Sequence, residues 1–72
     1  FTVPVNEHVN LAVYNLEGRL VKTLVDQIMS SGQHITKWDG TNEKGTKVST
    51  GMYIYQLRTN STLLNRRMTF VK

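Results

Sequence analysis

The feature that most constrains this chain is a two-residue alternation of side chains in short runs. In the first long run, one set of alternate residues is apolar and consists of Val9, Leu11 and Val13. The run ends before Asn15 and Gly18. A period of two is the period of a β-strand with one buried face, and Asn and Gly are common turn residues. This stretch therefore predicts a strand, a tight turn and the start of a hairpin.

The same alternation continues along the chain and indicates an all-β domain. Strands are predicted at residues 1–3, 9–14, 20–25, 33–38, 51–58 and 63–71. We expect residues 26–32 to be a connection with Ile28 and Met29 tucked under the core, and residues 39–45 to be an exposed loop. A seventh strand would lie at residues 45–49 or upstream of Phe1. Such strand spacing predicts a β-sandwich or a small barrel of six to seven strands, one domain spanning residues 1–72.

Size and composition argue for a module that binds or anchors. A chain of 72 residues forms one domain at most and buries only a thin core. Its hydrophobic share of 39% and charged share of 19% are ordinary for a folded domain and argue against disorder. It has no cysteine, which excludes disulfides and thiolate metal sites. A deep catalytic cleft would need more chain, so we expect no enzyme activity.

The charge pattern gives little support to a nucleic-acid partner. The net charge is +4, but the basic residues are spread along the chain and only Arg66 and Arg67 are adjacent. No basic patch with interleaved stacking aromatics is present. No stretch approaches the roughly 20 apolar residues of a membrane-spanning helix, so no transmembrane segment is expected. The chain starts at Phe1 without a signal-like segment, and we expect it to be a fragment of a larger exported protein.

Neither the histidines nor the carboxylates form a catalytic motif. His8 and His34 have no acidic motif beside them, and no serine lies in a nucleophile-elbow context. The five carboxylates are all predicted in turns or loops; they are Glu7, Glu17, Asp26, Asp39 and Glu43. No catalytic residue, metal site or cofactor is therefore predicted.

Two weaker binding hypotheses stay open. Residues 39–45 are rich in side-chain oxygens, but Lys44 stands where a calcium loop of the EF-hand type needs glycine, so an ordinary turn is favoured. Sugar-binding sandwiches expose a flat row of aromatic rings. Trp38, Tyr53 and Tyr55 are expected inside this domain, which leaves only Tyr14, Phe1 and Phe70 for such a surface.

An ordered set of short motifs resembles a known family. It consists of Val13-Tyr14 before the Gly18 turn, the corner Trp38-Asp39-Gly40, Gly51 with Tyr53 and Tyr55, and the closing pair Arg67-Met68. This set is similar to the FlgD-like immunoglobulin-like domain, shared by the flagellar hook-capping protein and the C-terminal sorting domains of type IX secretion. The residues themselves suit fold-making roles: Trp38 can fill a thin core, and Asp39 can accept backbone N–H groups of the following loop.

The resemblance implies an immunoglobulin-like antiparallel β-sandwich of six to seven strands and a place at the end of an exported bacterial protein. Sorting domains of this kind are recognised by the outer-membrane secretion machinery and can direct attachment to cell-surface polysaccharide. The implied location is secreted or cell-surface. The alternatives are a carbohydrate-binding or spacer module of an extracellular glycoside hydrolase and a scaffold domain of the flagellar hook cap.

The last predicted strand carries the candidate partner-binding residues, which are Arg66, Arg67, Met68, Phe70 and Lys72. If this strand lies at a sheet edge, its free backbone groups can pair with a strand of a receptor or of a second copy. The arginines would then provide the charge contacts.

Overall fold

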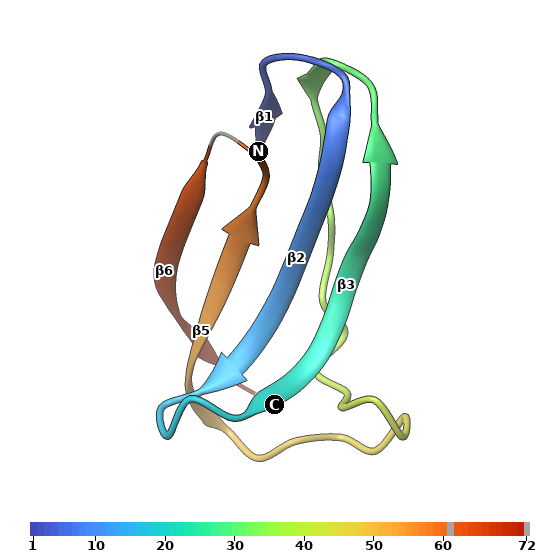
Figure 1. Ribbon diagram of the computed structural model, residues 1–72. Helices are drawn as coiled ribbons and strands as arrows, with labels where there is room; N and C mark the ends of the chain where they lie inside the picture. The colour runs from blue at the N-terminus through green and yellow to red at the C-terminus, as the bar shows by residue number, and fades with distance from the viewer. Residues whose placement is uncertain (61, 72) are drawn as a thin grey trace.

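The computed structural model describes residues 1–60 and 62–71, and this part of the chain is built from β-strands, turns and loops. The strands are β1 (Thr2–Val3), β2 (Glu7–Asn15), β3 (Leu20–Met29), β4 (Gly32–Gln33), β5 (Gly51–Arg58) and β6 (Leu63–Phe70). They form a four-stranded antiparallel sheet in the order β3-β2-β5-β6 and a two-stranded sheet of β1 and β4 (Figure 1). The predicted all-β sandwich is confirmed. Among the described residues there is no helix of the length and hydropathy needed to cross a membrane.

The tight turn between β2 and β3 is organised by the Asn15 side chain. Its Oδ1 accepts the backbone N–H groups of Glu17 and Arg19, both at 3.0 Å. Gly18 has a φ of 85°, a left-handed conformation that residues with a Cβ avoid. The Gly18 N–H donates to the carbonyl oxygen of Asn15 at 3.0 Å and closes the turn. The predicted hairpin is therefore confirmed.

The core lies on the inner face of the four-stranded sheet and follows the alternation of β2. Val9 and Val13 are fully buried and Leu11 is nearly so, because all three lie on one face of this central strand. Leu57 of β5 and Val3 of β1 are also buried. Full burial of a side chain of this size contributes about 1.5–3 kcal/mol, so these few residues matter greatly in a domain this small.

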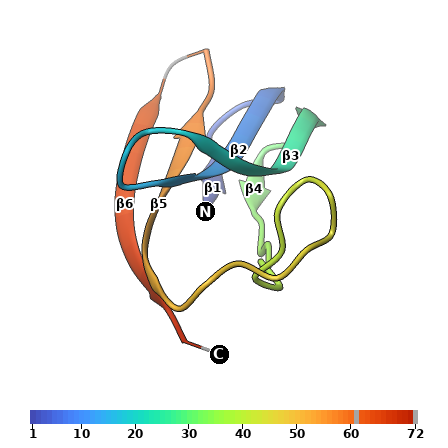
Figure 2. The ribbon, with the colours of Figure 1, turned by 90° about the horizontal axis from the view of Figure 1, so that it is seen from below.

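The second layer of the sandwich is thin. β1 and β4 have two residues each, with Thr2 opposite Gln33 and Val3 opposite Gly32. Figure 2 shows this small sheet facing the curved four-stranded sheet, while the long connection from β4 to β5 passes across one end of the molecule. The second layer thus covers only part of the inner face.

Strand β3 is longer than predicted. Residues 26–29 were predicted in a connection, but β3 continues to Met29, which lies opposite Glu7 of β2. Met29 packs against the core as expected, whereas Ile28 is 75% exposed and is not tucked under it. The backbone of β2 provides hydrogen-bonding partners for residues 26–29. These backbone hydrogen bonds extend the strand although several side chains of this stretch are polar.

The strand predicted at residues 33–38 is wrong in extent, because only Gly32–Gln33 forms a strand. Every second residue from His34 to Trp38 is nevertheless half-buried and the residues between are exposed, which is the alternation of a strand. Along the described residues, the ladder between β1 and β4 runs up to the Phe1–His34 pair. No described residue forms a backbone hydrogen bond with residues 35–38.

No seventh strand is found at residues 45–49 within the described chain. An isolated bridge pairs Thr41 with Lys47 instead. Gly40 and Gly45 have φ values of 79° and 80°, so the chain turns twice in this short stretch. A chain that turns so often cannot form the continuous ladder of a strand.

Candidate partner-binding edge and adjoining cavity

β6 is one edge of the four-stranded sheet. It pairs with β5 over its whole length, from Leu63 opposite Arg58 to Phe70 opposite Gly51. On the other side of β6, none of the residues described by the structure pairs with it. An edge strand keeps unpaired backbone N–H and C=O groups and can accept a further strand. Strand pairing with a partner requires that β6 lie at a sheet edge, and β6 does so.

Arg66 and Arg67 lie on opposite faces of this edge strand. Arg66 is opposite Tyr55, which packs against the core, whereas Arg67 is opposite Ile54 and faces away from it. Both side chains are exposed, and neither forms an ion pair with a described residue. Arg66 and Arg67 therefore place one positive charge on each face of β6.

Met68 and Phe70 point into the molecule. Met68 lines a cavity between the layers, and the ring centroid of Phe70 lies 5.1 Å from that of Trp38. Both residues are half-buried, and their role in partner binding stays a prediction. Lys72, the remaining predicted partner-binding residue, lies outside the described residues.

Trp38 is the centre of a small aromatic cluster. Its ring contacts Tyr53 edge-on, with centroids 5.2 Å apart, and also contacts Phe70. The Trp38 indole N–H donates to the carbonyl oxygen of Thr41 at 2.8 Å, and the Tyr53 hydroxyl donates to the carbonyl oxygen of Ser49 at 2.7 Å. The predicted internal positions of Trp38 and Tyr53 are confirmed.

The aromatic residues do not form a sugar-stacking surface within the described chain. Phe1 and Phe70, predicted as surface aromatics, are half-buried because Phe1 packs against the core and Phe70 against Trp38. None of the six aromatic side chains is largely exposed. The flat row of rings that a sugar-binding module presents is missing from these residues.

The Asp39 carboxylate organises the turn that follows Trp38. Its Oδ1 accepts the Thr41 hydroxyl at 2.6 Å and the Thr41 backbone N–H at 3.1 Å. The bond from the Thr41 hydroxyl lowers the pKa of Asp39 below its usual value of 3.8; partial desolvation opposes this, while Lys22 and Lys47 act in the lowering direction. The predicted turn-forming role of Asp39 is confirmed.

Glu43 attaches the loop of residues 39–47 to the opposite edge of the sheet, at β3. The backbone N–H of Glu43 donates to the carbonyl oxygen of Val21 at 3.1 Å, and its carboxylate accepts the N–H of Thr23. The Lys22 ammonium donates to the Thr41 hydroxyl at 2.8 Å. The loop thus occupies backbone groups that β3 would otherwise leave unpaired.

These bonds also bear on the calcium hypothesis. The carboxylate of Asp39 bonds to Thr41 and that of Glu43 bonds to Thr23, so the two are committed to different partners. In the part of the chain that the structure describes, no group of three or more His, Cys, Asp or Glu residues could hold a metal ion.

The two histidines lie in unrelated surroundings. His8 Nε2 is 2.8 Å from a carboxylate oxygen of Asp26 on the neighbouring strand, and both side chains are exposed. His34 Nε2 is 2.8 Å from the carbonyl oxygen of Ser30, and its ring lies 5.6 Å from that of Phe1. The sequence did not predict the His8–Asp26 pair, because only the hairpin register brings these residues together.

Glu7 and Asp26 lie in strands and not in the predicted turns. Glu7 begins β2 and is only 7% exposed, and its carboxylate accepts the backbone N–H of Asn60 at 3.1 Å. It therefore ties the β5–β6 connection to the start of β2. Glu7, like Val9 and Leu11, lies on the inward face of β2, because alternate residues of a strand share a face. This two-residue spacing is the sequence feature that indicates its burial.

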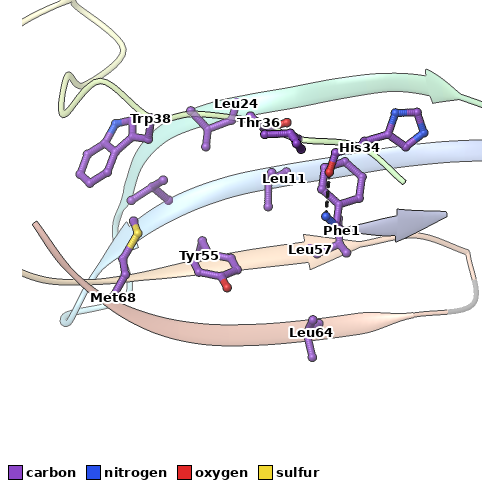
Figure 3. Close-up of a pocket in the computed structure, with 12 residues that line it drawn as sticks. Phe1, Leu11, Leu24, His34, Thr36, Trp38, Tyr55, Leu57, Leu64 and Met68 are labelled. Atoms are coloured by element: carbon purple, nitrogen blue, oxygen red, sulfur yellow. Dashed lines mark hydrogen bonds between the residues drawn. The ribbon is translucent and has the colours of Figure 1, made fainter. Parts of the chain in front are cut away.

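A cavity of about 450 Å³ lies between the two layers, beside β5 and β6 (Figure 3). Its lining residues are Phe1, Leu11, Val13, Leu24, His34, Ile35, Thr36, Trp38, Tyr55, Leu57, Leu64 and Met68. Arg66 lies between Leu64 and Met68 on the same face of β6, so it borders this mainly apolar space. The cavity could not be predicted from the sequence, because residues distant in the chain line it.

The comparison with known proteins identifies the family. The sequence model of the FlgD Ig-like domain matches residues 4–62, which is most of the chain. Searches of curated proteins and of solved structures found no match. The match spans the β2–β3 hairpin, the Trp38 corner and β5, whereas β1 and β6 lie outside it. The chain belongs to the FlgD Ig-like domain family.

Proposed function

We propose that this chain is a non-catalytic module that sorts an exported bacterial protein and attaches it to the cell surface. In this proposal, β6 is the strand that the partner recognises. The observation that carries it is the free edge of β6, with an exposed arginine on each face. The partner is the outer-membrane secretion machinery, or a cell-surface polysaccharide once the protein is outside.

Recognition would proceed by strand addition. A partner strand laid along β6 would gain backbone hydrogen bonds, which give affinity, and side-chain contacts on both faces, which give specificity. Arg66 and Arg67 would each meet an acidic group on a different face of the added strand. A second copy of the module could use the same edge, so self-association is the competing event at this site.

Localisation of a fused reporter tests the proposal. The module is fused to the C-terminal end of a reporter behind a signal peptide and produced in a Bacteroidetes host, with and without a working type IX system. We expect delivery to the surface or medium only where the system works. Retention in the periplasm of both strains would contradict the sorting function.

A scaffold role in a flagellar cap is the second candidate, and the family match favours it. A scaffold domain would bind other flagellar components and would not route a reporter. Co-purification with hook proteins, together with periplasmic retention of the reporter in both strains, would support the scaffold and exclude sorting.

A further inference from the structure

The outer face of the four-stranded sheet carries a polar hollow of about 410 Å³. Figure 2 shows β1 and β4 on the opposite side of this sheet, so neither strand covers the hollow. The side chains that line it include His8, Asn10 and Tyr14 of β2 and Gln56 and Arg58 of β5. A hollow of this volume can hold a small ligand, and polar groups that converge in it provide specificity.

The register of β2 and β5 brings these side chains together. Asn10 lies directly opposite Arg58. His8 and Tyr14 share the face of Asn10, because alternate residues of a strand point to the same side of a sheet. This face is the one opposite Val9, Leu11 and Val13, so the hollow is separate from the core and from the cavity between the layers.

Arg58 provides a positive charge with most of its donors unused. Its side chain is exposed and forms no ion pair with a described residue. Its Nη2 is 3.5 Å from Oε1 of Gln56, which is long for a hydrogen bond. Gln56 is itself held, because its Nε2 donates to Oδ1 of Asn65 at 3.0 Å. Gln56 therefore orients a guanidinium group whose other N–H donors remain available for a ligand.

The remaining polar groups of the hollow both donate and accept hydrogen bonds. Asn10 and Tyr14 are half-buried, and neither side chain bonds to a residue that the structure describes. Asp26 of β3 lies opposite Asn10 and accepts from or pairs with His8 at 2.8 Å. The hollow thus has a cation on its β5 side, an amide and a phenol in β2, and a carboxylate beside it on β3.

We propose that this hollow binds a carboxylated sugar, that is, a uronic acid unit of a polysaccharide. The guanidinium of Arg58 pairs with the sugar carboxylate, since both groups are planar and can form two parallel hydrogen bonds. Asn10 and Tyr14 bond to the sugar hydroxyls, which donate and accept as these side chains do. Such a site needs no row of exposed rings. It lies on β2 and β5 and goes beyond the proposed role of β6.

The direction of the ligand follows from the charges on this face. Asp26 would repel a carboxylate, so the carboxylate lies toward Arg58 and the hydroxyls lie toward β3. Arg67, opposite Ile54, adds a second positive charge on the same face.

The strand order favours a sugar over an acidic peptide. β2 and β5 are inner strands with a neighbour on each side, so a peptide cannot bind here by strand addition. Side chains alone must hold the ligand. Those of the hollow are mostly polar and offer a peptide little apolar surface, whereas every hydroxyl of a sugar can use them.

Titration of the purified chain with trigalacturonate tests the inference, followed by the amide signals in nuclear magnetic resonance. We expect shifts at Asn10, Tyr14 and Arg58. Galactotriose, which has the same hydroxyl pattern without carboxylates, should bind at least about 10-fold more weakly. Arg58→Gln should weaken trigalacturonate by a similar factor. Arg67→Gln is the matched control, because it removes the same charge from the same face outside the hollow and should keep the affinity within about twofold.

Three results would overturn the proposal. Absence of shifts with trigalacturonate, or equal affinity for galactotriose, would show that the hollow does not recognise a carboxylated sugar. Equal losses in Arg58→Gln and Arg67→Gln would show only a general attraction between a cationic domain and an anion. A triglutamate peptide that binds as tightly as trigalacturonate would refute the assignment to a sugar. These titrations use purified protein, so their outcome is independent of the reporter assay for sorting.

Discussion

The two edges of the four-stranded sheet differ in how their backbone groups are used. At β3, the loop of residues 39–47 folds back, and Glu43 bonds to Val21 and Thr23. At β6, no described residue takes such a place, and Arg66 and Arg67 stand exposed on its two faces. Proteins commonly protect edge strands against unwanted pairing. The loop covers the β3 edge at Val21 and Thr23, whereas no described residue covers β6, and this difference supports β6 as the edge that a partner would use.

The largest expected effect comes from Gly40→Ala, which breaks the anchor of the covering loop. Gly40 has a φ of 79°, and a Cβ there would overlap the Phe70 ring. Strain and overlap together should cost about 3 kcal/mol of unfolding free energy. Gly45→Ala is the matched control, because Gly45 has a φ of 80° and open space around it, so it should lose only about 1 kcal/mol. Equal losses in urea titrations of the two variants would refute the packing of Phe70 on Gly40.

Glu7→Ala should have the next largest effect, because it releases the β5–β6 connection from β2. The buried carboxylate accepts the Asn60 N–H, and a hydrogen bond to a charged group contributes about 1.5–3 kcal/mol. We expect the free energy of unfolding to fall by about 2 kcal/mol and hydrogen exchange at Asn60 to become faster. Glu7→Gln retains an acceptor oxygen and should lose clearly less. A Gln variant as unstable as the Ala variant would show that the Asn60 bond is not the source.

Glu43→Ala frees the Thr23 N–H at the β3 edge and should cost about 1 kcal/mol, since the lost bond is exposed and the backbone bond to Val21 remains. The freed backbone of β3 should then promote dimers at high concentration, measured by sedimentation equilibrium. Glu43→Gln keeps an acceptor and should stay closer to the original chain. If Glu43→Ala leaves both stability and association unchanged, the loop does not protect β3.

The smallest effect is a shift in acid stability from Asp39. Its pKa is lowered in the folded chain, so its contribution to stability is present above the unfolded pKa and is lost as the pH falls through the folded pKa. The difference in thermal midpoint between the original chain and Asp39→Asn should therefore shrink as the pH falls below about 4. A carboxyl titration by nuclear magnetic resonance with a midpoint above 3.8 would contradict the lowered pKa of Asp39.

The sequence predicted the parts of the fold that alternation and turn residues encode. The β2–β3 hairpin, the inner face of β5 and the turn at Asp39 follow from periodicity and local hydrogen bonding, which depend on neighbours in the chain. The lengths of β3 and β4 could not be predicted in this way. Each strand extends as far as its pairing with a neighbouring strand does, and no described residue pairs with residues 35–38.

The candidate site was predicted only in outline. The residues of β6 were identified, but their placement on two faces of an edge depends on strand order, which alternation does not specify. The covering of β3 by Glu43 joins residues 20 positions apart, and the cavity joins Phe1 to Met68. Such long-range contacts leave no local pattern in a sequence.

The most direct test of the β6 assignment is delivery of the reporter fusion carrying Arg66→Glu and Arg67→Glu. The matched control is Arg19→Glu with Lys44→Glu, which makes the same charge change at exposed positions away from β6. If β6 is the recognised strand, the first variant should stay in the periplasm with an unchanged circular dichroism spectrum, while the control is delivered normally. Normal delivery of the Arg66→Glu, Arg67→Glu variant would contradict the role of these arginines at the edge.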